Sequence, residues 1–283
     1  CRHWSRYVPI EDYLLTLKRH VVSFVDCYLY KDALQASRDI VSMEEHIQTL
    51  RAKLYGSDIG ASISLGQAYS QLGQVYAYLQ DPDAEKFFKN ALSIFDDTSS
   101  DAYRTQSYLL HYYIEVGDKA SYEQLAVDYF GGNHTLVDQL SYIQSLPEQE
   151  VHVQSMAFAL YVYVKALYVL YRDDIGAFIT NQLHRIEQDI RKAVLINSHP
   201  WELIYTYLSL IALQAGNNPL AIVWRDKIKN SVYNPGKPIT HRMIYGLMRF
   251  YEQVNDTKTA QNYREKLIKD NVDIEQYMTY MNR

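Results

Sequence analysis

Residues 66–95 read GQAYSQLGQVYAYLQDPDAEKFFKNALSIF, and this stretch decides the fold. In its first half, aromatic, apolar and glycine residues recur at the spacing that puts them on one face of a helix: Tyr69, Leu72, Gly73 and Tyr76. The polar segment QDPD at 80–83 interrupts this pattern, and its proline suits the start of a second helix. In that second helix, the residues that share a face are Ala84, Phe88 and Ala91. The stretch therefore predicts two helices joined by a short turn, with small residues where the helices cross.

The pattern resembles the tetratricopeptide (TPR) repeat, a helix–turn–helix unit of about 34 residues. Looser copies occur elsewhere in the chain. Residues 201–232 carry the spacing of the family at Tyr205, Leu208, Ala212, Gly216 and Ala221. Residues 240–267 carry it at Leu247, Tyr251, Ala260, Tyr263 and Leu267. The resemblance implies an all-α fold, a right-handed α-α superhelix (a TPR-like solenoid) of about six helical hairpins.

One segment departs from the family pattern. Between residues 102 and 130, Tyr113 and the pair Gly117-Asp118 match the aromatic residue and the turn of a repeat. However, Tyr122 stands where a small residue is usual. A bulky side chain at this crossing is expected to push the two helices apart.

Three parts are expected along the chain. Residues 1–130 form the N-terminal TPR-like hairpins, and residues 151–283 form the C-terminal TPR-like hairpins with a capping helix. Residues 131–150 form an irregular break, because they combine Gly131-Gly132, Pro147 and a short acidic stretch.

The composition excludes several classes of function. The net charge of −5 argues against direct contact with nucleic acid, which favours a basic surface. No run of about 18 apolar residues occurs, so the sequence predicts no transmembrane segment. Tyrosine is unusually frequent, with 27 copies, and its amphipathic ring suits half-buried helix faces.

Catalytic and metal-binding motifs are absent from the sequence, which contains no HExxH, phosphate-binding glycine loop, GxSxG or CxxC. His184 and Glu187 lie three residues apart, a spacing used in di-metal bundles, but such sites need a second pair and further carboxylates. Cys1 and Cys27 make neither a disulfide framework nor a metal cluster. We therefore expect no enzymatic activity, no cofactor and no metal.

The resemblance also implies a binding groove, because in TPR proteins the first helix of each hairpin lines the concave surface. The groove positions that do not serve packing are then Gln67, Ser70, Gln74 and Tyr78 in one hairpin, Arg104, Ser107, His111 and Glu115 in the next, and Arg242, Tyr245, Arg249 and Glu252 in the last. Amides, hydroxyls and arginines suit an extended peptide, whose backbone needs donors and acceptors. The simpler alternative is that these residues form solvated helix faces.

One TPR sub-family is not predicted. Its members hold the C-terminal carboxylate of chaperones with a Lys/Asn clamp, and here Ser70 and Gln74 stand at the corresponding positions.

The expected function is that of a non-enzymatic scaffold that binds a protein or peptide in the concave groove, in the cytoplasm. The first alternative is the peptide-sensing regulatory domain of a bacterial transcription regulator or signalling protein, present here as a fragment. Intracellular receptors for short signalling peptides carry such a domain behind a DNA-binding N-terminus, although residues 1–60 contain no helix-turn-helix. The chain begins at Cys1 rather than Met, which leaves a second alternative. This is a lipoprotein, anchored to a membrane through Cys1, that acts as an accessory subunit of an envelope assembly.

Overall fold

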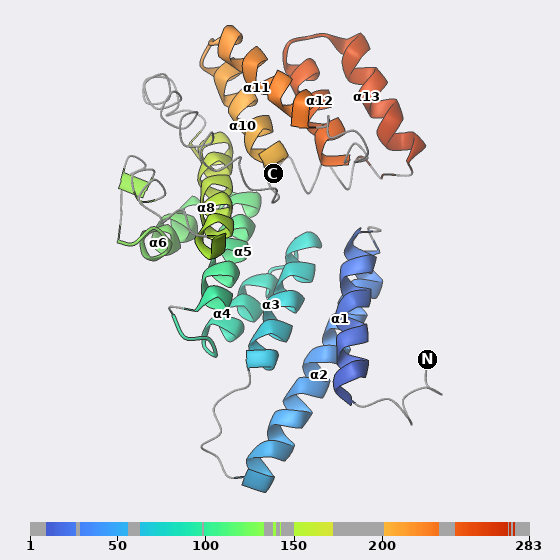
Figure 1. Cartoon of the computed structure of the whole chain (residues 1–283), viewed down its shortest axis with the longest axis vertical. Helices are drawn as coiled ribbons and strands as arrows, with labels where there is room; N and C mark the ends of the chain where they lie inside the picture. Colours follow the sequence, from blue (N-terminus) through green and yellow to red (C-terminus); the bar gives the residue numbers. More distant parts are fainter. Residues whose placement is uncertain are drawn as a thin grey trace. The chain divides into compact units, whose positions relative to one another are not determined.

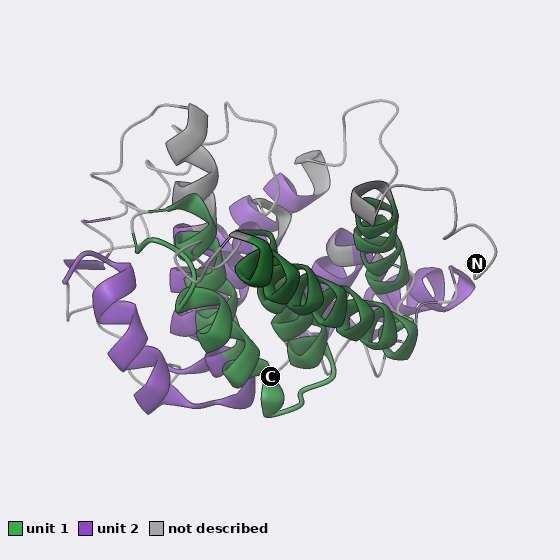
Figure 2. Cartoon of the chain, turned by 90° about the horizontal axis from the view of Figure 1, so that it is seen from below, with its two compact units in different colours: residues 1–112 green, residues 113–283 purple. Residues whose placement is uncertain are grey.

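A computed structural model of the chain describes residues 10–26, 29–55, 63–97, 99–132, 138–139, 142, 150–171, 201–231, 241–270, 272 and 274. Within these ranges the regular structure is helical throughout, with eleven helices and no strand (Figure 1). The all-α fold class is therefore confirmed. The chain divides into two compact units, residues 1–112 and 113–283 (Figure 2).

Unit 1 is built from helices that pack against their neighbours in the chain. They are α1 (Ile10–Asp26), α2 (Tyr30–Tyr55), α3 (Ile63–Tyr78), α4 (Asp83–Leu92) and the larger part of α5 (Ser100–Val116). Helix α1 packs against α2, α2 against α3, and α3 against α4. The order of packing therefore follows the order of the sequence, as in a helical array.

Helices α3 and α4 form the hairpin expected from residues 66–95, although α3 begins three residues earlier, at Ile63. The small residues predicted at the crossing are buried, and Ala84 and Ala91 are completely inaccessible to solvent. Gly73 lies so close to Phe88 that a Cβ atom there would meet the phenyl ring at 2.8 Å. The hairpin thus depends on a missing side chain in α3 that lets the ring of α4 approach the backbone.

Unit 2 contains the end of α5 and the remaining helices. These are α6 (Lys119–Tyr129), α8 (Glu150–Val169), α10 (Trp201–Gln214), α11 (Asn218–Ser231), α12 (His241–Gln253) and α13 (Thr257–Lys269). Helices α10 and α11 pack as one pair, and α12 and α13 as another. Helix α10 also contacts α8 and α12, and α11 contacts α12. The core of unit 2 includes Trp224, Leu208 and Phe250, all with at most 2% exposure.

Within the part of the chain that the structure describes, the same turn joins two consecutive helices at four places. A residue with positive φ ends the first helix, and these residues are Gln80, Gly117, Gly216 and Asn255. In each turn, this residue donates to the carbonyl three positions back, and the following Asp or Asn donates to the carbonyl five positions back. These two bonds define the Schellman motif, which satisfies carbonyls left free at a helix end.

The turns also explain a difference in spacing between the repeats. In three of them the amide of the fourth residue of the second helix donates to the carbonyl four residues back: Tyr122 to Asp118, Ala221 to Asn217, and Ala260 to Asp256. In the α3–α4 turn, Ala84 donates instead to the carbonyl of Asp81, three residues back. This turn is therefore one residue shorter, and the position of Ala84 corresponds to that of Tyr122 in the next repeat.

Tyr122 is completely buried, and its ring lies edge-on to Tyr171 at a centroid distance of 6.4 Å. The expected effect of this residue on the angle between helices stays a prediction. Most of the expected break at 131–150, and all but the first residues of the expected capping helix at 270–283, lie outside the described residues. The same is true of Cys1, Cys27, His184 and Glu187.

Candidate functional site

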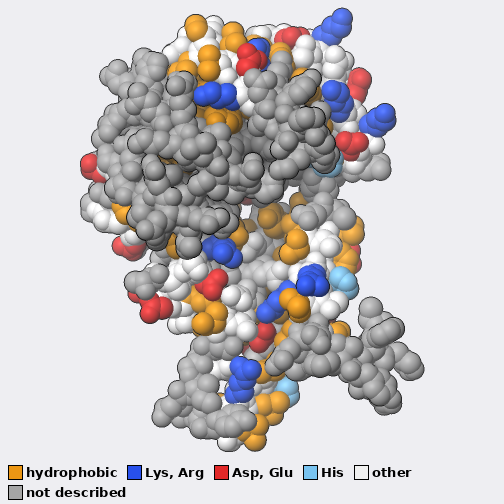
Figure 3. Space-filling model, viewed as in Figure 1, with side chains coloured by type: hydrophobic (Ala, Val, Ile, Leu, Met, Phe, Trp, Pro, Cys, Tyr) orange, Lys and Arg blue, Asp and Glu red, His pale blue; other side chains and the backbone are white. Residues whose placement is uncertain are grey.

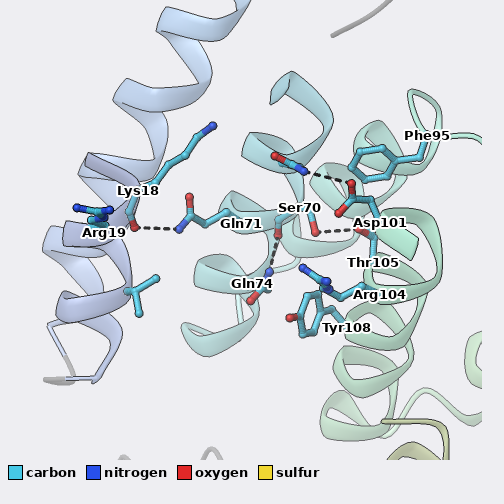
Figure 4. A pocket seen from close by; sticks show the side chains of 12 residues that line it. Lys18, Arg19, Ser70, Gln71, Gln74, Phe95, Asp101, Arg104, Thr105 and Tyr108 are labelled. Atoms are coloured by element: carbon cyan, nitrogen blue, oxygen red, sulfur yellow. Dashed lines mark hydrogen bonds between the residues drawn. The ribbon is translucent and has the colours of Figure 1, made fainter. Parts of the chain in front are cut away.

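A pocket of about 460 Å³ lies in unit 1 between three helices, α1, α3 and α5 (Figure 4). Its lining residues are Lys18, Arg19 and Val22 of α1, Gln67, Ser70, Gln71 and Gln74 of α3, Phe95 of the α4–α5 connection, and Asp101, Arg104, Thr105 and Tyr108 of α5. Helix α1 is the first helix of the pair α1–α2, and α3 and α5 each precede one of the Schellman turns. Two of these helices, α3 and α5, carry residues that the resemblance to TPR repeats places in a groove.

Four of the expected groove residues come together in this pocket: Gln67, Ser70, Gln74 and Arg104. Ser70 forms the floor, because its hydroxyl lies 2.9 Å from Thr105 Oγ1 and both residues are buried. Gln67 Nε2 donates to Asp101 Oδ2 over 3.1 Å, and Gln74 Nε2 donates to the carbonyl of Ser70 over 3.4 Å. The bonds of Ser70 and Gln67 join α3 to α5, whereas the bond of Gln74 stays within α3, and together they hold two side-chain amides beside the pocket.

Helix α1 supplies a side of the pocket that was not expected. Lys18 Nζ lies 3.3 Å from Glu44 Oε1, a buried carboxylate of α2, and the carbonyl of Lys18 accepts from Gln71 Nε2 over 3.5 Å. Lys18 and Arg19 stand between the buried Leu14 and Val21 in the sequence. In residues 66–78, the groove positions were taken to be those that do not serve packing. The same criterion applied to residues 10–26 selects Lys18 and Arg19, because they are polar positions beside an apolar stripe.

The ionisable groups in the pocket are mainly cationic. Lys18, Arg19 and Arg104 face a single lining carboxylate, Asp101. Burial raises the pKa of the Tyr108 hydroxyl above its ordinary value, and the positive charge of Arg104 opposes that rise. Arg104 thus lies close enough to Tyr108, one helical turn further along α5, to act on its charge. On the face of unit 1 shown in Figure 3, Lys and Arg side chains lie beside hydrophobic ones over α1 and α3.

Three of the expected groove residues of unit 1 do not line the pocket. Ser107 is 1% exposed and donates to the carbonyl of Arg104 over 2.7 Å, so its assignment to the groove was wrong. A serine that satisfies its hydroxyl within its own helix can be buried without a further partner. Tyr78 is half-buried and stacks on Tyr30 at 5.5 Å, and His111 is half-buried further along α5.

The expected groove residues of the last hairpin have a different environment. Tyr245 is 2% exposed, and burial raises the pKa of its hydroxyl, so this residue belongs to the core and its assignment to the groove was wrong. Arg249 Nη1 lies 3.3 Å from Glu252 Oε2, while Arg264 of α13 lies 3.2 Å from Glu252 Oε1. The guanidinium of Arg249 is thus engaged with α12 itself, and the side chain of Arg242 lies outside the described residues. Glu115 is buried as well.

Unit 2 has its own pocket, of about 660 Å³, beside α10, α11 and α12. Leu213, Ile222, Phe250 and Val254 give it an apolar lining. Its arginine, Arg225, lies over the ring of Phe250 at 5.4 Å and is paired with Asp226 Oδ1 at 2.7 Å. This pocket therefore offers a surface for apolar contact, and its cation, Arg225, is already paired with the carboxylate of Asp226.

Within the described residues, no group of three or more His, Cys, Asp or Glu side chains is placed to hold a metal ion. None of the described helices combines the length and the apolar composition that crossing a membrane requires. The chain matches no protein-family model, no curated protein and no solved structure in the three comparisons that were made. The resemblance to TPR repeats therefore stays a prediction that rests on residue spacing and on the geometry of the turns.

Proposed function

We propose that this protein is a non-enzymatic scaffold of TPR-like repeats that binds an extended peptide or protein segment in the pocket of unit 1. The observation that carries the proposal is the origin of the pocket lining. Apart from Phe95, it comes from α1, α3 and α5, which alternate along the chain with α2 and α4. In a TPR-like superhelix of about six hairpins, these are the helices that face the ligand.

The repeated turn supports this architecture. Among the described helix pairs, four are separated by a Schellman motif with the same pair of hydrogen bonds, and these pairs occur in both units. Internal repetition of a helical hairpin is the defining property of solenoid proteins, which use their inner surface for binding.

The chemistry of the lining favours a peptide over a small apolar ligand. Ten of the twelve lining side chains carry a hydrogen-bonding group, and only Val22 and Phe95 do not. Pockets for small molecules are lined mainly by apolar and aromatic side chains. An extended peptide offers one donor and one acceptor per residue, and Gln71, Gln74 and Tyr108 can supply the complementary groups.

The test is selection from a library of random-sequence peptides displayed on phage, against the wild-type chain and a double variant, Arg104→Ala with Gln74→Ala. The matched control is Arg51→Ala with Gln35→Ala, which removes the same two side-chain types from exposed positions of α2. We expect the selected peptides to bind the wild type and the control, and to lose binding to the pocket variant. Peptides that bind all three proteins equally would place the binding surface elsewhere and overturn the proposal.

The same selection bears on the two more specific alternatives. A short consensus of a few residues would favour a peptide-sensing domain of a regulator, whereas a long segment with dispersed contacts would favour a scaffold or an accessory subunit of an assembly.

A further inference from the structure

We propose that the unit 1 pocket selects an acidic segment, with carboxylates that pair with Arg104 on one side and Arg19 on the other. The inference rests on the proposed peptide binding and adds the chemical class of the ligand. It begins from the state of the charged groups that line the pocket.

The two anionic groups near the pocket are already engaged. Asp101 accepts the amide of Gln67 at 3.1 Å, and Glu44 is buried and pairs with Lys18 at 3.3 Å. Lys18 is therefore neutralised by its neighbour. Glu44 is thus paired with a cation of the protein, whereas Asp101 uses only Oδ2 in a bond with a neutral amide and keeps its charge.

The two arginines are in the opposite state. Among the residues that the structure describes, no hydrogen bond or ion pair is recorded for the guanidinium of Arg19 or Arg104, and both side chains are exposed. A guanidinium carries five donors in a planar fork that matches a carboxylate. Two such guanidinium groups at a polar pocket form a local site for anions, although the net charge of the chain is −5.

The two arginines come from different helices, which determines how the ligand lies in the pocket. Arg19 comes from α1 and Arg104 from α5, and Figure 4 shows them on opposite sides of the α3 residues Ser70, Gln71 and Gln74. A segment that reaches both guanidinium groups must cross α3 and its side-chain amides. We therefore place one acidic group of the ligand at each arginine, separated by backbone that meets the amides.

An acidic peptide fits this arrangement better than nucleic acid. Nucleic acids need a run of cations that follows the phosphates, and Asp101 interrupts the cations of this pocket. Paired carboxylates on an extended backbone use the guanidinium forks and the glutamine amides together.

The test uses two synthetic peptide pools of random sequence that differ at two fixed positions. One pool has Glu at both positions and the other has Gln, so that the pools match in shape and differ in charge. Binding of each fluorescent pool is measured for the wild type, for Arg104→Gln with Arg19→Gln, and for the control Arg51→Gln, with circular dichroism to verify folding. A third pool with Glu and an amidated C-terminus shows whether a terminal carboxylate contributes.

We expect the wild type and the control to prefer the Glu pool by about 10-fold or more, which corresponds to the loss of a charged hydrogen bond. The arginine variant should bind both pools equally, and added salt should reduce the preference of the wild type. Equal binding of the Glu and Gln pools by the wild type would overturn the acidic ligand while leaving peptide binding intact. Binding of neither pool would contradict the proposed function as well. If the preference for Glu over Gln disappears when the C-terminus of the Glu pool is amidated, a terminal carboxylate binds at the site. That result would overturn the proposal that two acidic side chains pair with the arginines.

Discussion

Gly73 of α3 lies directly against the ring of Phe88 of α4, at a distance where an added methyl group would come within 2.8 Å of Phe88 Cδ1 and 2.9 Å of Cε1. Phe88 is completely buried, and Ala84 and Ala91 of the same helix are completely buried too. The ring therefore cannot move outward to make room. This contact determines how closely the two helices of the hairpin approach.

We expect Gly73→Ala to destabilise the protein, although alanine forms helices better than glycine by about 1 kcal/mol. Overpacking in a buried contact costs about 1–3 kcal/mol, and here the clash is with a ring enclosed on all sides. Urea unfolding measures the change in the free energy of unfolding. The matched test is the same substitution in a Phe88→Leu background, where the smaller side chain should reduce the cost. A Gly73→Ala variant that is more stable than the wild type would show that the ring has room to shift.

The cap of α6 predicts a dependence of stability on pH. Asp118 Oδ1 accepts from the backbone N–H of Ser121 over 3.0 Å, and this bond lowers the pKa of Asp118 from its ordinary value of 3.8. Because the pKa is lower in the folded state, the stability from the cap is complete above about pH 3.8 and is lost as the pH falls through the folded-state pKa. Asp118→Ala should cost about 1 kcal/mol at neutral pH. Asp118→Asn keeps the hydrogen bond without the charge. The melting temperature of this variant should therefore approach that of the wild type only in acid, where the wild-type Asp118 is protonated as well.

A tyrosine between α2 and α3 should titrate late. The hydroxyl of Tyr69 donates to Glu45 Oε1 over 2.6 Å, and the pKa of Tyr69 is raised to about 12, first by burial and then by this bond and the charge of Glu45. The raised pKa means that the stability from this phenol is complete below about pH 10 and is lost as the pH rises toward about 12. In Glu45→Gln, we expect the pKa of Tyr69 to move back toward 10. NMR titration of ring-labelled tyrosine, assigned with Tyr69→Phe, measures it. An unchanged pKa in Glu45→Gln would leave burial as the sole cause.

The hairpins were predictable from the sequence because they depend on local signals. Gly73, Ala84 and the polar turn between them lie within a dozen residues, and small residues at a crossing leave a pattern that spacing alone detects. The left-handed turn residues are equally local, since Gly117 and Gly216 are followed at once by a capping Asp118 or Asn217.

The site was predicted less completely because polarity does not determine exposure. Ser107 and Tyr245 were expected in the groove as polar residues on first helices, but one bonds within its own helix and the other buries its ring. Lys18 and Arg19 were missed because groove positions were assigned only within residues 67–78, 104–115 and 242–252, although both residues lie between the buried Leu14 and Val21. The pairing of residues fifty positions apart leaves no local signal at all.

The buried pair of Lys165 and Glu115 is such a case, and it provides the last prediction. Lys165 Nζ lies 2.5 Å from Glu115 Oε1, and the two residues are 1% and 8% exposed. Burial raises the pKa of Glu115, and the positive charge of Lys165 opposes that rise. Lys165→Met would leave the carboxylate buried without its cation, so we expect a loss of about 3–5 kcal/mol in the free energy of unfolding.

The pH dependence separates this mechanism from a simple packing defect. Without Lys165, the folded-state pKa of Glu115 should rise further above its ordinary value of 4.5. The Lys165→Met variant should then be closest to the wild type below about pH 4.5 and lose stability as the pH rises through the folded-state pKa. The double variant Lys165→Met with Glu115→Gln has no buried charge, and it should recover much of the loss and show no such slope. A single variant that is equally destabilised at every pH would assign the effect to the shape of the side chain rather than to the stranded charge.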